Sequence, residues 1–390
     1  MKKTVAIALI LCAVFALFPV SSFAASDSVP LTGEVINVYN WGLYISDGTD
    51  GTLDVNAEFT RRTGIQVNYS TYEDNESLYT KLKTGGSSYD IIIPSDYMIA
   101  KLIEEDMLEK LNFENIPNYK YIDESFKNTD YDPTNEYSVP YTWGTVGIIY
   151  NTKYVDPIDS WSALWDERYS DKILMFGNSR DAFAISAFLL GLSINSTDEG
   201  EIRQMADKLA EQKPFVQQYV MDQSYSQMIN EEAWLVPYYA GDYLVMAEEN
   251  PDLAFCHPKE GFNVFIDAIC IPKSAQNKSA AEKYINFLCD PEISGGNMDA
   301  IGYSTPISEA KQYMDPETAS SAIAYPDEET LERAVSFTNL PTETIRQMNS
   351  LWTSIKSGNG LPWYLFVIVG VAIAAAAIFI VIRKKKRNSY

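Results

Sequence analysis

Apolar and polar residues follow two different rhythms along the first third of the chain. Short runs rich in β-branched and aromatic residues, typical of strands, are separated by stretches with helical periodicity. The predicted strands span residues 34–39, 66–70 and 89–93, and the predicted helices between them span residues 54–62, 77–84 and 99–105. This βαβ order indicates an α/β fold with a parallel sheet. The uninterrupted apolar run at residues 91–93 is typical of a strand that is covered on both faces.

A second set of strand-like runs follows the first. It begins near residues 147–150, and further predicted strands lie at residues 173–176, 234–238 and 268–271. Residues 341–356 carry apolar side chains at helical spacing, which predicts a helix that docks one face on a lobe. About 330 residues lie between the two end segments described next, and that length is enough for two lobes.

Both ends of the chain have the patterns of membrane-targeting segments. Lys2 and Lys3 precede an apolar run and then small residues, so we expect residues 1–24 to be a signal peptide; an uncleaved anchor is the alternative. Residues 363–382 are uncharged and long enough to cross a bilayer as a helix. The basic residues 383–390 would then form a cytoplasmic tail. The pattern predicts an exported, single-pass membrane protein with its main domain on the extracellular or periplasmic side.

The chain is strongly acidic, with 53 Asp and Glu residues against 30 Lys and Arg and a formal net charge of −23. Every acid lies between the two predicted membrane segments. Such a field repels nucleic acid and attracts small cations, although acidity also serves solubility. Three cysteines, Cys256, Cys270 and Cys289, remain after removal of the signal peptide. They are too few for a disulfide scaffold and lack the spacing of a zinc site, so we expect them to be core residues. We expect the protein to bind neither a metal nor a cofactor.

Signatures of catalysis are missing from the sequence. His257 is the only histidine, and no Gly-x-Ser-x-Gly motif, phosphate-binding loop or zinc-binding pair occurs. A hydrolase that uses a pair of carboxylates is the remaining enzymatic alternative. We therefore predict a binding protein and not an enzyme.

Aromatic and acidic motifs recur along the chain, and the first of them follows a predicted strand, where open α/β sheets bind their ligands. Trp41 and Tyr44 follow the first strand. The later motifs are Pro-Ser-x-Tyr ending at Tyr97, Arg180-Asp181, Tyr-Ala-Gly-Asp starting at Tyr239, Phe265-x-Asp267 and Ile-Gly-Tyr ending at Tyr303. In order and spacing these motifs resemble the spermidine/putrescine-binding family of ABC-transporter substrate-binding proteins, from residue 34 to about residue 358.

The resemblance implies a type II periplasmic-binding-protein-like fold, in which two α/β lobes close like a hinge on a ligand held between them. The chain would cross between the lobes near Trp143, near Asp267 and near residues 311–315. The first lobe would comprise residues 33–143 and 267–312, and the second residues 144–266 and 313–358. The implied ligand-binding residues are Trp41, Tyr44, Ser95, Tyr97, Asp181, Tyr239, Asp242, Phe265, Asp267 and Tyr303.

The partners implied by the resemblance are a polyamine and the permease and ATPase subunits of an ABC importer, with the chain otherwise a monomer. A polyamine is a chain of methylenes that carries ammonium groups. Each ammonium buried in a closed cleft needs a carboxylate or the face of an aromatic ring. This requirement explains why acids and aromatic residues occur together in the motifs.

Some positions depart from the family pattern and leave alternatives open. Leu43 stands where relatives commonly carry an acid, and Asn178 where some carry Asp; fewer acids would favour a diamine or weaker binding. Putrescine and spermidine both remain open. The runner-up is the same fold tuned to another small cationic or amino-acid-like solute, whose carboxylate would call for a cationic side chain in the cleft. Asp181 could instead cap a helix or pair with Arg180, and Asp96 is expected in a turn outside the cleft.

Overall fold

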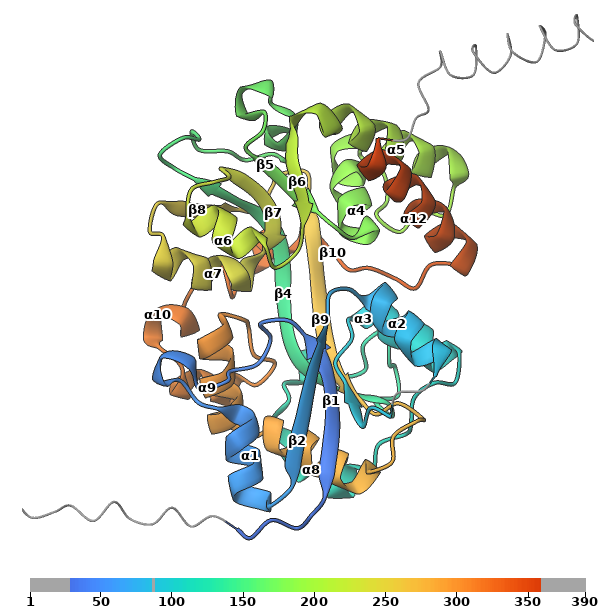
Figure 1. Ribbon diagram of the computed structural model, residues 1–390, viewed down its shortest axis with the longest axis vertical. Coiled ribbons are helices and arrows are strands. Elements are labelled where there is room, and N and C mark those ends of the chain that lie inside the picture. Colours follow the sequence, from blue (N-terminus) through green and yellow to red (C-terminus); the bar gives the residue numbers. More distant parts are fainter. Residues whose placement is uncertain (1–28, 86–87, 359–390) are drawn as a thin grey trace, which may run out of the picture.

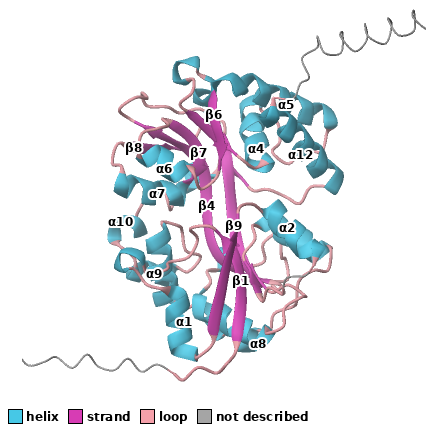
Figure 2. Cartoon of the chain, viewed as in Figure 1, coloured by secondary structure: helices cyan, strands magenta, loops and turns pink. Residues whose placement is uncertain are grey.

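Two lobes lie one above the other in Figure 1, and each is a sheet flanked by helices. The computed structural model describes residues 29–85 and 88–358. Two long strands, β4 (Ser138–Asn151) and β9 (Phe262–Cys270), pass through the junction of the lobes and pair antiparallel with each other. Figure 2 shows that these strands make one sheet continuous through both lobes, in the order β2-β1-β3-β9-β4-β7-β5-β6, with β10 beside β9 and β8 beside β4.

The first lobe is built around β1 (Val35–Trp41), which pairs in parallel with β2 (Gln66–Tyr72) and β3 (Ile91–Ile92). Every second residue of β1 is buried, because its side chains alternate between the core and a less covered face. The helices around this sheet are α1 (Val55–Thr63), α2 (Asn75–Thr84), α3 (Asp96–Glu104), α8 (Lys278–Leu288) and α9 (Pro291–Ile301).

The ends of α1 illustrate how local sequence sets the element boundaries. The carboxylate of Asp54 accepts the amide of Ala57 at 2.8 Å and so satisfies a free donor of the first turn. The helix ends at Gly64, whose φ of 73° is the left-handed conformation that glycine adopts at little cost. The predicted range of 54–62 therefore lies within one residue of the observed helix.

The second lobe contains β5 (Ile173–Phe176), which pairs in parallel with β6 (Val216–Val220) and β7 (Leu235–Tyr239). All four residues of β5 are buried, as expected for a strand covered on both faces. Two short strands pair alongside the long ones: β8 (Leu253–Cys256) pairs with β4, and β10 (Ala334–Val335) pairs with β9. The helices are α4 (Ser179–Leu190), α5 (Glu199–Gln212), α6 (Ser224–Ile229), α7 (Ala240–Glu249), the short α11 (Glu328–Leu331) and α12 (Thr342–Ser357). The short α10 (Pro316–Ala319) lies beside α9 of the first lobe in Figure 1, and the amide of Asp315 before it donates to Asp299 of α9.

The helix predicted at 341–356 is α12, and it docks one face as predicted. Trp352 is buried in this face, and its indole nitrogen donates to the carbonyl oxygen of Gly177 at 2.9 Å. Tyr219 meets the indole edge-on, with 5.1 Å between the ring centroids. These contacts attach α12 beside the start of α4.

The expectation of a parallel sheet is only partly right. β1 pairs in parallel with β2 and β3, β5 with β6 and β7, and β10 with β9. In contrast, β3 pairs antiparallel with β9, and β4 pairs antiparallel with β7, β8 and β9. The strand expected from residue 147 begins at Ser138 instead. Pro140 and Gly144 weaken the strand pattern in the local sequence, but the pairing with β9 accommodates both residues. Asp96 is also not in a turn: it is the first residue of α3 and is buried.

Among the described residues, all three cysteines are free thiols; Cys270 and Cys289 are buried and Cys256 is partly buried. None of the helices in residues 29–85 and 88–358 combines the length and the apolar character needed to span a membrane. The predicted signal peptide (1–24), span (363–382) and tail (383–390) lie outside the described residues.

Candidate ligand-binding cleft

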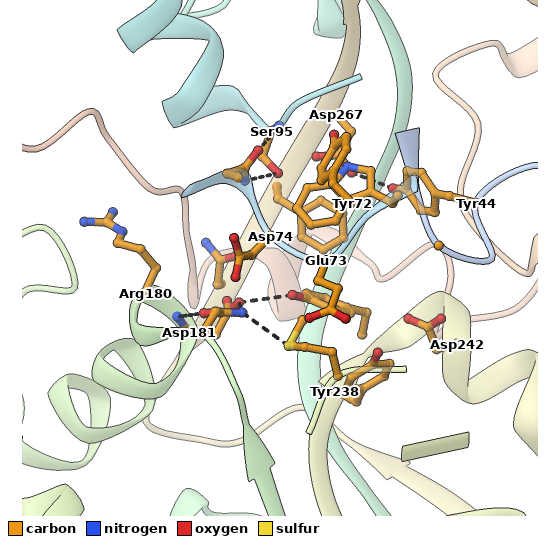
Figure 3. Close-up of a pocket in the computed structure, with 18 of the residues that line it drawn as sticks. Tyr44, Tyr72, Glu73, Asp74, Ser95, Arg180, Asp181, Tyr238, Asp242 and Asp267 are labelled. Atoms are coloured by element: carbon orange, nitrogen blue, oxygen red, sulfur yellow. Dashed lines mark hydrogen bonds between the residues drawn. The ribbon is translucent and has the colours of Figure 1, made fainter. Parts of the chain in front are cut away.

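A cleft lies at the junction of the lobes, where the carboxyl ends of strands from both lobes meet (Figure 3). Trp41 ends β1, Ser95 follows β3, Asp181 follows β5, and Tyr239 ends β7. This edge is where ligands bind in open α/β sheets. The structure brings all ten predicted residues to this one cleft: Trp41, Tyr44, Ser95, Tyr97, Asp181, Tyr239, Asp242, Phe265, Asp267 and Tyr303.

Asp267 supplies a carboxylate from the long strand β9. Its Oδ2 accepts the hydroxyl of Tyr44 at 2.6 Å, and that hydroxyl lies 2.5 Å from the Oγ1 of Thr142. Its Oδ1 is buried without a hydrogen-bond partner in the described part of the chain. Burial, more than any other cause, raises the pKa of Asp267 to about 6. The cleft therefore contains a desolvated carboxylate whose pKa is lowered again, in part, by the side chains of Tyr44 and Ser95.

Asp181 supplies a second carboxylate, from the first turn of α4 in the other lobe. Its Oδ2 accepts the hydroxyl of Tyr239 at 3.0 Å and the side-chain amide of Asn178 at 2.8 Å. Asn178 is the residue that caps α4, by accepting the amide of Asp181 at 3.0 Å. Burial raises the pKa of Asp181 above its usual range. The suggestion that Asp181 caps the helix is thus wrong, since Asn178 has that role.

Asp242 lies in the first turn of α7 and differs from Asp267 in its partners. The hydroxyl of Tyr303 donates to its Oδ2 at 2.6 Å, and the hydroxyl of Tyr225 donates to its Oδ1. Both oxygens are therefore occupied by donors from the protein. Burial raises the pKa of Asp242 to about 7.

Aromatic rings form the walls between these acids. Trp41 is fixed by a hydrogen bond from its indole nitrogen to the carbonyl oxygen of Ile93 at 2.8 Å, and its ring lies 4.7 Å from that of Tyr72. Tyr239 and Phe265, which also line the cleft, meet edge-on with centroids 5.5 Å apart. Such surfaces can cover methylene groups and attract cations through their faces.

Four further acids line the cleft that sequence reasoning missed: Glu73, Asp74, Glu76 and Asp222. Glu73 and Asp74 directly follow β2, so the rule that ligands bind at carboxyl ends of strands would have found them. Leu43, which stands where relatives commonly carry an acid, is 58% exposed and is not among the residues that line the cleft. Together with Asp181, Asp242 and Asp267 these acids bring seven carboxylates to the cleft.

Arg180 is the one basic residue among those that line the cleft. Its guanidinium lies over the ring of Phe337, 4.4 Å from the centroid, and donates through Nη2 to the side chain of Asn195 and the carbonyl of Thr338, each at 3.3 Å. Its Nε and Nη1 have no partner among the described residues. Figure 3 shows this group pointing away from Asp267 and Asp242.

A cleft of this kind, between two α/β lobes that share crossing strands, defines a solute receptor. The chain belongs to the family described as bacterial extracellular solute-binding proteins, whose model matches residues 87–332. Family membership confirms the prediction that the protein is not an enzyme.

Two curated relatives and one solved structure show the similarity. The spermidine/putrescine-binding periplasmic protein of Salmonella typhimurium is 34% identical over 316 residues, 80% of this chain and 88% of the relative. The putrescine-binding periplasmic protein SpuD of Pseudomonas aeruginosa is 30% identical over 345 residues, 83% and 92% of the two chains. The structure of the spermidine/putrescine ABC transporter substrate-binding protein PotD of Streptococcus pneumoniae is similar with a TM-score of 0.70 and 35% identity, over 83% of this chain and 99% of that one.

Proposed function

We propose that this protein is the exported solute receptor of an ABC importer, and that it binds a polyamine, either putrescine or spermidine or both, for delivery to the permease and ATPase subunits. One observation carries the proposal: Asp181 and Asp267 are buried carboxylates from opposite lobes of one aromatic cleft, and for both of them desolvation raises the pKa more than the neighbouring groups, Arg180 beside Asp181 included, lower it. A buried charge without a partner is costly, so these acids are suited to receive cations. The names of the relatives agree with this ligand class.

In the proposed complex, the ten predicted residues form the binding site. Asp181 and Asp267 would each take an ammonium group, while Asp242 adds negative potential. Trp41 and Phe265 would cover the methylene chain. Each cation–π contact in such a desolvated site contributes about 2 kcal/mol. The separation of the two acids along the cleft would then select the spacing between amines.

The proposal includes the division of the chain and its location. Residues 33–143 and 267–312 would move as one lobe and residues 144–266 and 313–358 as the other, with residues 363–382 as a membrane span. A tether of this kind would keep the monomeric receptor at a high local concentration beside the permease.

An amino-acid-like solute is the second candidate, because Arg180 lines the cleft and has two nitrogens without partners among the described residues. Three features favour the polyamine. The guanidinium lies against Phe337 and Tyr97, it points away from the central acids in Figure 3, and it is outnumbered by seven carboxylates. A solute carboxylate would be repelled by most of this cleft.

Isothermal titration calorimetry of residues 25–358 tests the proposal, with putrescine, spermidine, amino acids and sugars as ligands. We expect heat with at least one polyamine and none with sugars. Absence of heat with both polyamines would overturn the ligand assignment. Binding of an amino acid alone, abolished by Arg180→Gln, would establish the second candidate instead.

A further inference from the structure

We infer that Asp242 acts as a cross-lobe latch: it accepts the hydroxyl of Tyr303 from the opposite lobe and stabilises the closed cleft, instead of pairing directly with a ligand ammonium. Asp242 would thus be a positioning residue that acts on affinity through Tyr303. The latch itself does not depend on the ligand, whereas its effect on polyamine affinity rests on the proposed function.

The two partners come from different lobes. Asp242 is in the first turn of α7, which packs in the upper lobe of Figure 1, and Tyr303 follows the end of α9 in the lower lobe. Their hydrogen bond of 2.6 Å therefore joins segments that would separate if the lobes opened. Asp242 is 6% exposed and Tyr303 is 4% exposed, so water competes little for this bond.

The backbone around the pair is shaped for close approach. A Cβ atom at Gly241 would lie only 2.4 Å from the ring of Tyr303. A Cβ atom at Gly302 would lie 2.4 Å from the carbonyl oxygen of Gly241, and Gly302 has a φ of +75°. Two glycines that face each other across the lobes let the ring of Tyr303 lie directly on the start of α7.

The partners of Asp242 also set it apart from the proposed ammonium ligands. Its second oxygen accepts Tyr225 of α6, which lies in the same lobe as Asp242. Both oxygens of Asp242 thus have tyrosine donors at hydrogen-bond distance, whereas the Oδ1 of Asp267 has no such donor within hydrogen-bond distance among the described residues, although Ser95 lies near enough to lower its pKa. An ammonium at Asp242 would have to displace a tyrosine hydroxyl, so Asp267 is better placed to receive it.

Tyr303→Phe and Tyr225→Phe form a matched pair of variants for testing the latch. Each removes one hydroxyl from the same carboxylate, but only Tyr303 reaches across the lobes. The lobe separation is measured in the ligand-free full chain in detergent, by single-molecule energy transfer between dyes at the exposed helix positions Ala57 of α1 and Ala210 of α5. The off-rates of putrescine and spermidine are measured in parallel.

We expect Tyr303→Phe to lower the ratio of closed to open molecules by about tenfold or more, the scale of a hydrogen bond to a charged group. Tyr225→Phe should change it little. Tyr303→Phe should also raise both off-rates, and Asp242→Asn should weaken putrescine and spermidine by the same factor.

Several results would overturn the latch. The first is that the ligand-free protein shows no closed molecules. The second is that Tyr303→Phe leaves the closed fraction unchanged, and the third is that Tyr303→Phe and Tyr225→Phe change it equally. If Asp242→Asn does not fold, the tyrosine pair decides the question alone. Failure of the wild type to bind any polyamine would refute the proposed function, and the dye distances would still decide whether the latch exists.

Discussion

Asp267→Asn removes one negative charge from the cleft while keeping the shape of the side chain. The Asn carbonyl oxygen can still accept the Tyr44 hydroxyl that Oδ2 of Asp267 accepts at 2.6 Å, so the local structure should persist. What disappears is the charge on a side chain that is only 3% exposed. Breaking a buried charge pair on one side typically costs about 3–5 kcal/mol, which corresponds to a loss of affinity of roughly 10²- to 4 × 10³-fold.

The same substitution should stabilise the empty protein at neutral pH. Burial raises the pKa of Asp267 from 3.8 to about 6, so the folded state retains a proton between these pH values after the unfolded state has released it. Stability therefore falls as the pH rises through this window, and above it the desolvated carboxylate costs on the order of 1–3 kcal/mol. Asn carries no such cost. The variant should gain that amount over the wild type at pH 7.5, and the gain should vanish below about pH 4.

Calorimetry with spermidine and chemical denaturation of the empty protein at pH 7.5 and pH 4 measure both effects. Asp132→Asn is the matched control, because Asp132 is equally buried but accepts the amides of Tyr137 and Ser138 away from the cleft. The control should lose stability and keep its affinity. Unchanged affinity in Asp267→Asn would show that the cleft is misassigned, and reduced stability of its empty form would refute the desolvation argument.

Three further predictions follow from the cleft and the core. Burial raises the pKa of Asp242 to about 7 and that of Asp267 to about 6, so cation binding should release protons and the affinity should rise with pH between about 5 and 7.5. Binding heats that do not depend on the ionisation enthalpy of the buffer near pH 6.5 would contradict this prediction. Gly241→Ala should speed polyamine release in stopped-flow measurements, because the new Cβ would meet the ring of Tyr303. The fold should keep its stability, because alanine favours the helix more than glycine does. An unchanged release rate would count against the close contact between the lobes. Trp352→Ala should lower the free energy of unfolding, measured by urea denaturation, by about 3–5 kcal/mol, because the packing of the ring and its hydrogen bond to Gly177 are lost. The polyamine affinity should stay within about twofold. A large loss of affinity would mean that α12 also shapes the cleft.

Elements with strong local signals were predictable from the sequence. The capping Asp54 and the terminal Gly64 set α1, and the apolar run at residues 173–176 matches β5. β4 was not predicted at its full length, because its pairing with β9 joins residues more than a hundred positions apart. Periodicity in a short window does not contain that information.

The candidate site was predictable where motifs mark it. The motifs at Trp41, which ends β1, and at Asp267, within β9, were found through their resemblance to a known family, and the structure brings both to one cleft. Asp222 was missed because β6, the strand it follows, has a polar and partly exposed sequence that does not stand out as a strand. The hydrogen bond between Asp242 and Tyr303 depends on how two lobes meet, which no local pattern encodes.

The most direct measurement is a crystal structure of residues 25–358 with spermidine. We predict the ligand inside the cleft, with one ammonium within hydrogen-bond distance of Asp267, another near Asp181, and its methylenes against Trp41 and Phe265. A polyamine bound outside the cleft, or one whose ammonium groups contact neither carboxylate, would contradict the central claim.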